Sequence, residues 1–281
     1  MSVINTNVSA LYSQNAMKTN TRAMNTAMEQ LSTGTRVNSA KDDAAGLAIG
    51  QSMTSQIRGL NQAVRNANDG INMLQTAEGA LVEQSNMLQR MRELAVQASN
   101  GTYSSAQRGY LDTEFSALID QIDSIASTTT WNGQYVLTGS GGNGPTTTAG
   151  SGTYQFQTGQ SSGQTISITI SGMASSALSL SSLSVSTAAG ASNALTTIDN
   201  ALDTINTTRA NLGATINRLA YAADNLTNIA ANVTQSRSTI MDTDYAQATT
   251  QLAKTQILQQ ASTAMLAQAN QQAQGIMTLL K

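Results

Sequence analysis

The feature that most constrains the fold is a sustained alternation of three- and four-residue spacings between apolar residues. Between Ala191 and Lys281 the chain has no proline and only two glycines. The spacing occurs in both halves of the chain, at Leu60, Val64, Ala67, Ile71, Leu74, Leu111, Phe115, Leu118, Ile122, Ile125, Leu195, Ile198, Leu202, Ile205, Leu212, Ile216, Leu219, Ala223 and Leu226. It places one apolar stripe along a helix, and packing on another helix buries such a stripe. We therefore predict long helices that pack against each other or against copies of the same chain.

Composition argues against catalysis and against most metal sites. The chain has no histidine and no cysteine, so it cannot use thiol chemistry, disulfides or the commonest metal ligands. Charged residues make up 11% of the chain and the net charge is −2, which gives little support to binding of nucleic-acid phosphates. We predict no enzymatic activity, no cofactor, no metal and no nucleic-acid partner.

Neither a signal peptide nor membrane insertion is predicted. Residues 1–15 lack a basic stretch followed by an apolar run. No stretch approaches the roughly twenty consecutive apolar residues that span a bilayer. If the protein leaves the cell, we expect a route that does not read a classical signal.

The middle of the chain has a different character. No Asp, Glu, Lys or Arg occurs between Ser124 and Ile198. Residues 138–152 are rich in Gly, Ser and Thr and predict a loop. Thr153–Gln157 and Thr165–Ile170 alternate apolar with polar residues, which predicts a β-hairpin. A short irregular strand is expected around Leu178–Val185. The predicted fold is mainly α: a long antiparallel helical coiled-coil core with a small β-hairpin region at the outer end.

Two short motifs suggest chemistry but have simpler interpretations. Gly139, Gly141 and Gly144 fit G-x-G-x-x-G, yet Pro145 and three threonines follow where a dinucleotide site needs a helix, so we predict a loop. The adjacent Asp42 and Asp43 are interpreted as residues at a helix start, because adjacent helix positions point about 100° apart.

Several segments together resemble one protein family. LSTGTRVNSAKDDAAGLAI, at Leu31–Ile49, closely resembles the N-terminal signature of bacterial flagellins. Further matches to the N-terminal and C-terminal signatures follow in the family's order, at Arg65–Ile71, Thr76–Leu81, Gln89–Gln97, Asn211–Ala214, Asp242–Tyr245, Gln256–Gln260 and Leu266–Asn270.

The resemblance implies a domain organisation. In flagellins the two termini pair in an inner core domain, a coiled coil that lines the central channel of the filament. By this mapping the inner core domain is 1–44 with 237–281, and the outer core helical domain is 45–236. A β-rich, uncharged variable tip at 131–190 belongs to the outer domain.

The resemblance also implies function and partners. The expected role is a structural subunit of the bacterial flagellar filament, secreted through type III export and self-assembling into a hollow helical polymer for swimming motility. Expected partners are further copies of the chain, the flagellar cap, hook-junction proteins and an export chaperone. The alternative is a hook–filament junction protein of the same superfamily, but the C-terminal signatures Gln256–Gln260 and Leu266–Asn270 favour filament flagellin.

Two sets of candidate site residues follow. The apolar stripes of the termini form the expected filament core interface, at Val3, Ile4, Val8, Leu11, Leu31, Leu252, Leu258, Met265, Ile276, Leu279 and Leu280. Because two such stripes alone bury little surface, we expect the terminal segments to fold on polymerisation. The resemblance extends to a patch recognised by Toll-like receptor 5, at Gln89, Arg90, Glu93, Leu94 and Glu114. The alternative interpretation is an inter-subunit contact in the filament, and we take this structural role as primary and recognition as incidental.

Overall fold

The computed structural model describes residues 6–139 and 151–279 of the chain. These residues form five helices and four short strands: α1 (Val8–Thr33), α2 (Ala44–Ser99), α3 (Ser105–Thr128), β1 (Thr130–Trp131), β2 (Gln134–Tyr135), β3 (Ser151–Gln157), β4 (Thr165–Ser171), α4 (Ala188–Met241) and α5 (Tyr245–Leu279). Helices account for 73% of the residues, which confirms the mainly α prediction. The glycine motif at Gly139–Gly144 and the loop predicted for 138–152 lie almost entirely outside the described residues.

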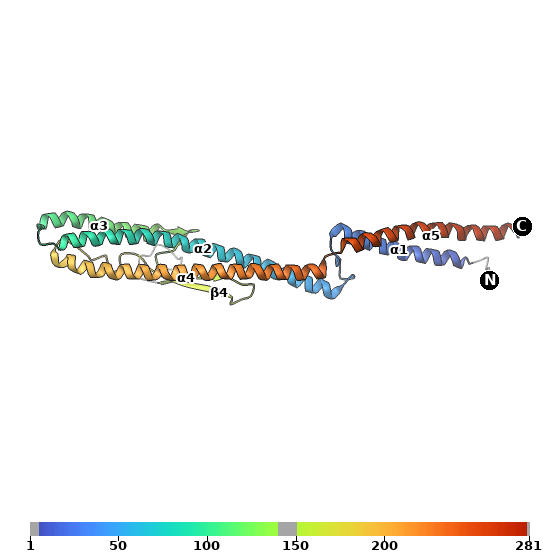
Figure 1. Cartoon of the computed structure of the whole chain (residues 1–281), viewed down its shortest axis with the longest axis horizontal. Helices are drawn as coiled ribbons and strands as arrows, with labels where there is room; N and C mark the ends of the chain where they lie inside the picture. Colours follow the sequence, from blue (N-terminus) through green and yellow to red (C-terminus); the bar gives the residue numbers. More distant parts are fainter. Residues whose placement is uncertain (1–5, 140–150, 280–281) are drawn as a thin grey trace. The chain divides into compact units, whose positions relative to one another are not determined.

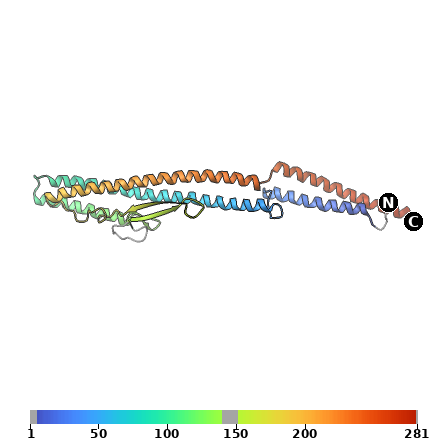
Figure 2. The ribbon, with the colours of Figure 1, turned by 90° about the horizontal axis from the view of Figure 1, so that it is seen from below.

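The chain divides into two compact units. Unit 1 contains Met1–Ile57 and Ala231–Lys281, and unit 2 contains Arg58–Ala230. In unit 1, α1 and α5 lie side by side in both ribbon views (Figures 1 and 2). The first unit thus brings together segments from the two ends of the sequence.

Within unit 1, backbone hydrogen bonds join the short segment after α1 to the C-terminal end of α4. Gly34 ends α1 in the left-handed conformation, with φ of 72°, and its N–H donates to Gln30. Thr35 then forms an antiparallel bridge with Asp242. The backbone N–H of Arg36 donates to the carbonyl of Met241 at 2.6 Å. Only glycine adopts positive φ without steric cost, so Gly34 allows this turn.

Unit 2 is built on three helices whose apolar stripes meet. The parts of α2 and α4 in this unit lie alongside α3 (Figure 1). Most of their buried side chains form one core, to which the helices contribute Leu74, Leu81, Leu88, Phe115, Ile122, Ile198, Ile205 and Leu212, among others. A smaller cluster of α2 and α4 contains Leu60, Ala63, Leu226 and Ala230. The helices predicted from the 3–4 spacing are therefore confirmed, and each buries the stripe that predicted it.

Two small antiparallel hairpins pack beside these helices. In the predicted hairpin β3 pairs with β4 from Ser151 opposite Ser171 to Gln157 opposite Thr165, which confirms it. The β1–β2 hairpin was not predicted, although its Asn132-Gly133 turn, with φ of 49° and 77°, is a strong hairpin signal.

The strand expected around Leu178–Val185 is wrong, because this segment forms turns. Local turns hold most of its backbone: the N–H groups of Leu178, Leu180 and Leu183 donate to carbonyls three to five residues earlier, and α3 supplies further acceptors at the two ends of this region. Asp123 accepts hydrogen bonds from the N–H and hydroxyl of Ser175, both at 2.7 Å, and Asp112 accepts one from the N–H of Val185 at 2.7 Å. Side-chain acceptors therefore satisfy donors that a sheet would otherwise pair.

Close packing of the β3–β4 hairpin on α2 depends on a glycine. A Cβ added at Gly70 would lie 2.9 Å from the ring of Phe156. We expect Gly70→Val to lower the free energy of unfolding of unit 2 by about 1–3 kcal/mol, because the ring or the hairpin must move. Gly79→Ala on the same helix is the control: nothing lies within 4 Å, so it should stabilise by roughly 0.5–1 kcal/mol. Equal effects of both variants in thermal unfolding would contradict this packing.

Candidate assembly surface

The contact between α1 and α5 follows a regular seam. At least partly buried side chains recur at three–four spacing along both helices, at Ala10, Ser13, Met17, Asn20, Met24, Ala27, Leu31, Ala248, Leu252, Thr255, Gln259, Ser262, Leu266 and Ala269. Among the described side chains of the pair, the buried ones are Asn20, Ala27, Ala248 and Thr255. The most enclosed positions are therefore small or polar, and the seam buries little apolar surface.

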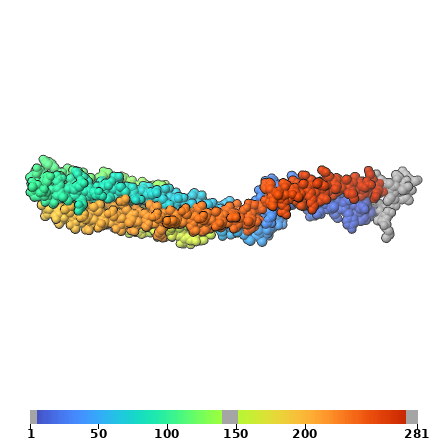
Figure 3. Space-filling model, in the orientation of Figure 1, coloured from blue at the N-terminus to red at the C-terminus, as the bar shows by residue number. Residues whose placement is uncertain are grey.

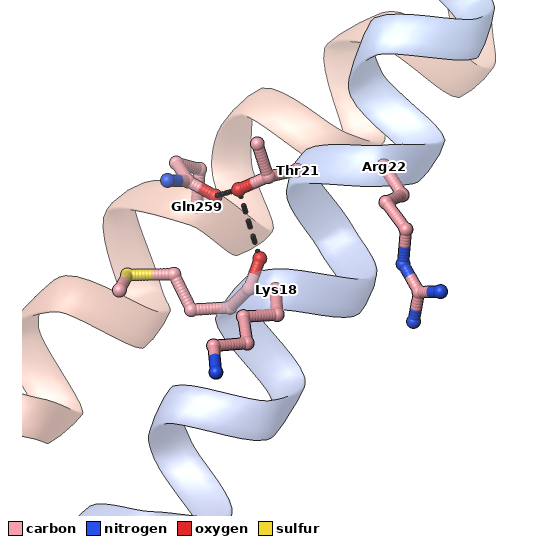
Figure 4. A pocket seen from close by; sticks show the side chains of 5 residues that line it. Lys18, Thr21, Arg22 and Gln259 are labelled. Carbon is pink, nitrogen blue, oxygen red and sulfur yellow. Dashed lines mark hydrogen bonds between the residues drawn. The ribbon is translucent and has the colours of Figure 1, made fainter.

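Hydrogen bonds between polar side chains hold the middle of this seam. The side-chain amide of Asn20 donates to the backbone carbonyl of Thr255 at 2.7 Å and to the side chain of Gln259 at 3.3 Å. The hydroxyl of Thr21 approaches the same oxygen of Gln259 at 3.3 Å (Figure 4). A buried polar residue at a coiled-coil seam favours one register, because any other leaves its amide without a partner.

Contacts nearer the ends of the pair fit the same antiparallel register. Asn7 donates to the carbonyl of Ala269 at 3.0 Å, and the hydroxyl of Tyr245 donates to the carbonyl of Leu31 at 3.0 Å. Asn7 also begins α1 as its N-cap, accepting from the N–H of Ala10. The pair is thus aligned by polar contacts along its length.

The large apolar side chains of the pair lie mainly on its outside. Leu11 is 58% exposed and Met265 is 63% exposed. Other exposed apolar and aromatic side chains of these two helices are Val8, Tyr12, Met28, Tyr245, Ile257 and Leu258. Figure 3 shows one face of the pair, on which the described part of α5 lies at the surface beside α1. An isolated coiled coil places such residues in its seam, so this distribution is typical of a pair with further neighbours.

Two open grooves follow the junction of the helices. One, of about 550 Å³, is lined by Met17, Lys18, Thr21, Arg22 and Gln259, and Figure 4 shows Arg22 pointing away from α5. The other, of about 590 Å³, is lined by further residues of the same helices, among them Tyr12 and Leu258. Both grooves offer space for side chains of a neighbouring helix.

The structure separates the predicted filament interface residues into two groups. Leu31 and Leu252 lie in the seam and are partly buried, whereas Val8, Leu11, Leu258 and Met265 are exposed. Val3, Ile4 and Leu280 lie outside the described residues, as do the side chains of Ile276 and Leu279. Sequence reasoning missed the exposed residues Tyr12, Tyr245 and Ile257.

The second predicted patch lies on unit 2. The guanidinium of Arg90 donates to Glu114 and to Glu93, each at 2.9 Å, and the three side chains are about half exposed. The hydrogen bond to Glu114 is the main reason that the pKa of Arg90 lies above its usual value. Gln89 is exposed and lines a shallow groove beside Glu93. Such exposed ion pairs contribute little to stability, so this cluster is available for contacts with other molecules.

One member of this patch requires a correction. Leu94 is only 1% exposed and belongs to the core of unit 2 with Met91, Ala95 and Ala98. On α2 these positions face α3 and α4, whereas Arg90 and Glu93 face outward. Leu94 therefore packs in the core of unit 2 and is not part of the exposed patch.

Comparison with known families agrees with this arrangement. The bacterial flagellin N-terminal helical region matches residues 4–141, and the bacterial flagellin C-terminal helical region matches residues 195–280. The chain belongs to the bacterial flagellin family. Within the described residues of this flagellin, no helix is long and apolar enough to cross a membrane.

Individual relatives cover the chain to different extents. The "Flagellar filament 31.3 kDa core protein" of Treponema maltophilum is 41% identical over 285 residues, covering 99% of this chain and 100% of the relative. Flagellin A of Vibrio anguillarum is 50% identical over 163 residues, which are 58% of this chain and 40% of that longer protein. The match to the longer protein thus spans less than half of that protein's length.

A solved structure shares the fold. A protein described as a flagellar hook-associated protein from Vibrio parahaemolyticus matches with a TM-score of 0.58 over 71% of this chain and 99% of that chain, at 16% identity. Identity this low supports a common fold alone. The full-length match to a filament protein at 41% identity leaves the hook–filament junction alternative not favoured.

Proposed function

We propose that this flagellin polymerises through the outward apolar surface of its α1/α5 pair. The family makes the chain a structural subunit of the flagellar filament, a role that requires contacts between many copies. The observation that carries the proposal is the distribution of side chains: the fully buried positions of the seam are small or polar, while many large apolar side chains of the pair lie exposed outside the seam. A neighbouring copy of the same pair is the natural partner for such a surface.

The energetics favour assembly over an isolated pair. Ordering a residue costs about 1–2 kcal/mol in backbone entropy alone, whereas alanines and threonines in a seam bury little apolar surface. Covering one half-exposed leucine contributes on the order of 1 kcal/mol, and each subunit carries several such side chains. We therefore expect the terminal segments to become fully ordered when neighbours cover them.

We assign the two units to the two predicted domains. Unit 1, with both chain ends, corresponds to the inner core domain that lines the filament channel. Unit 2 corresponds to the outer core domain and carries the two hairpins of the uncharged tip at 131–190. The basis of this assignment is that unit 1 contains both ends of the chain and the exposed apolar side chains of the α1/α5 pair, while unit 2 encloses the larger core.

Export and the remaining partners follow from membership of the family. We propose that the chain is secreted through the flagellar export apparatus and acts outside the cell in the filament. A thin, weakly packed α1/α5 pair suits passage through a narrow channel, because little packing must be lost. The flagellar cap, the hook-junction proteins and an export chaperone are the further partners we propose. The family is structural, which fits the absence of an enzymatic role.

Seeded polymerisation tests the central proposal. Purified protein mixed with short filament fragments should extend them, and electron microscopy should reveal hollow helical filaments. Sedimentation without seeds measures spontaneous growth in parallel. A protein that stays monomeric at high concentration, with seeds of its own filament present, would argue against assembly by this chain.

A second role is favoured by the exposed cluster of Arg90, Glu93 and Glu114. We propose that monomeric flagellin presents these side chains, with Gln89, to Toll-like receptor 5. We expect Arg90→Ala to lower receptor activation by monomer roughly tenfold, because a charge-assisted contact of about 1.5–3 kcal/mol is lost. Leu94 is left intact because its truncation would open the core. Arg65→Ala, at an exposed arginine elsewhere on α2, is the matched control; equal signalling by both variants would remove Arg90 from the recognised surface.

A further inference from the structure

We propose that Met28 and Met265 are two separate oxidation-sensitive positions on the α1/α5 pair, and that their conversion to methionine sulfoxide blocks assembly of the free subunit. The proposal rests on the function proposed above, because it concerns the surface of the α1/α5 pair. The chain has twelve methionines and no cysteine, so thioethers are its only sulfur groups. The oxidant is a peroxide of the hydrogen peroxide class.

The described methionines differ widely in exposure, and Met17, Met24, Met53, Met87 and Met241 are partly buried. Met265 is 63% exposed and Met28 is 53% exposed, whereas Met73, Met91 and Met173 are buried in the core of unit 2. A peroxide must reach the sulfur lone pair to react, so exposure controls the rate. The two exposed side chains lie on α1 and α5, outside the seam, among the apolar residues that a neighbouring copy would cover.

The reaction needs no group from the protein beyond the thioether. A sulfur lone pair attacks one peroxide oxygen, the O–O bond breaks and an S–O bond forms. The second oxygen leaves as water after taking up the proton of the transferred oxygen. The thioether is oxidised by two electrons and the peroxide is reduced, giving one sulfoxide and one water for each peroxide.

Oxidation makes two side chains polar on the surface that a neighbouring copy would cover. The thioether is apolar and flexible and packs well against irregular neighbours. The sulfoxide oxygen is a hydrogen-bond acceptor that water satisfies in the free subunit but an apolar contact does not. The monomer should keep its fold, because neither side chain lies in a core. Assembly should weaken, since the acceptor must lose its water.

Limited oxidation of monomer by hydrogen peroxide, followed by peptide mass spectrometry and seeded growth, tests the proposal. We expect sulfoxide at Met28 and Met265 at least tenfold faster than at Met73, Met91 and Met173, which are internal controls. The critical concentration for growth should rise about tenfold or more, with unchanged circular dichroism. In finished filaments, the same two residues should react at least tenfold more slowly than in monomer.

A double variant, Met28→Leu with Met265→Leu, shows whether oxidation of these two residues causes the loss of filament growth. It keeps apolar volume but cannot be oxidised there, so peroxide treatment should leave its growth nearly unchanged. Growth of the oxidised parent at the untreated critical concentration would overturn the inference while leaving assembly itself established. Equal inhibition of the double variant would overturn it too. Untreated protein that does not polymerise would refute the proposed function, and the inference with it.

Discussion

Removing residues 261–281 should abolish filament formation and leave a soluble, helical monomer. The deletion takes away Leu266 from the seam, the exposed Met265 and the contact between Ala269 and Asn7. Unit 2 loses nothing, because its core is formed entirely by residues between Arg58 and Ala230. α1 then lacks partners over its N-terminal half, so we expect that part to fray.

Circular dichroism, sedimentation and electron microscopy on the truncated protein measure this outcome. We expect the cooperative thermal transition of unit 2 at its original temperature, with no pelletable polymer at concentrations where the full chain grows. Filaments of normal stability would refute the idea that the α1/α5 pair builds the polymer. Global unfolding of the truncated chain would show instead that the C-terminal segment stabilises the whole monomer.

Charges placed on the outer surface of the pair should prevent assembly without unfolding the monomer. Leu11→Glu with Leu258→Glu changes two exposed side chains, one on each helix. In the monomer both carboxylates remain in water, so the free energy of unfolding should change by no more than about 0.5 kcal/mol. Between subunits each would lie unpaired against apolar neighbours, which costs several kcal/mol. We expect the critical concentration to rise at least about a hundredfold.

The matched control places the same charge elsewhere. Ser162 is exposed in the turn between β3 and β4, in the uncharged tip, so Ser162→Glu should leave growth within about twofold of the parent. Leu252→Ala gives a contrasting result: it should destabilise the pair in the monomer, because Leu252 lies in the seam. Normal growth of the double glutamate variant would mean that Leu11 and Leu258 face solvent in the filament.

The local pattern of apolar and polar residues was sufficient to predict the long helices and the main hairpin of this chain. The apolar stripes in α2, α3 and α4 end up inside the core of unit 2, because a continuous apolar stripe on a helix has to be covered by neighbouring helices. The β3–β4 hairpin follows from strict alternation, which commits one face to burial. The β1–β2 hairpin could have been predicted from its Asn132-Gly133 turn, since both residues tolerate positive φ.

The direction in which certain side chains point could not be predicted in the same way. Leu94 was placed on a surface because it belongs to a segment that resembles a recognised patch, and only the packing of α2 places it in the core. The segment at Leu178–Val185 carries apolar residues at spacings expected of an irregular strand, yet it forms turns, and Asp112 of α3 binds the N–H of Val185. The residues that bury Leu94 and the carboxylate that binds Val185 are distant in sequence, so the local pattern of residues does not reveal them.

The sequence by itself determined that this is a chain of long helices with a small β region, and its motifs identified the flagellin family. It did not determine which apolar residues of α1 and α5 lie between the helices and which lie outside. Both helices carry apolar residues on more than one face, so periodicity alone leaves several pairings open. The tertiary structure selects one through the hydrogen bond from Asn20 to Thr255, which joins positions 235 residues apart. Because a buried amide must find its acceptor, this contact fixes the register and directs Leu11, Leu258 and Met265 outward.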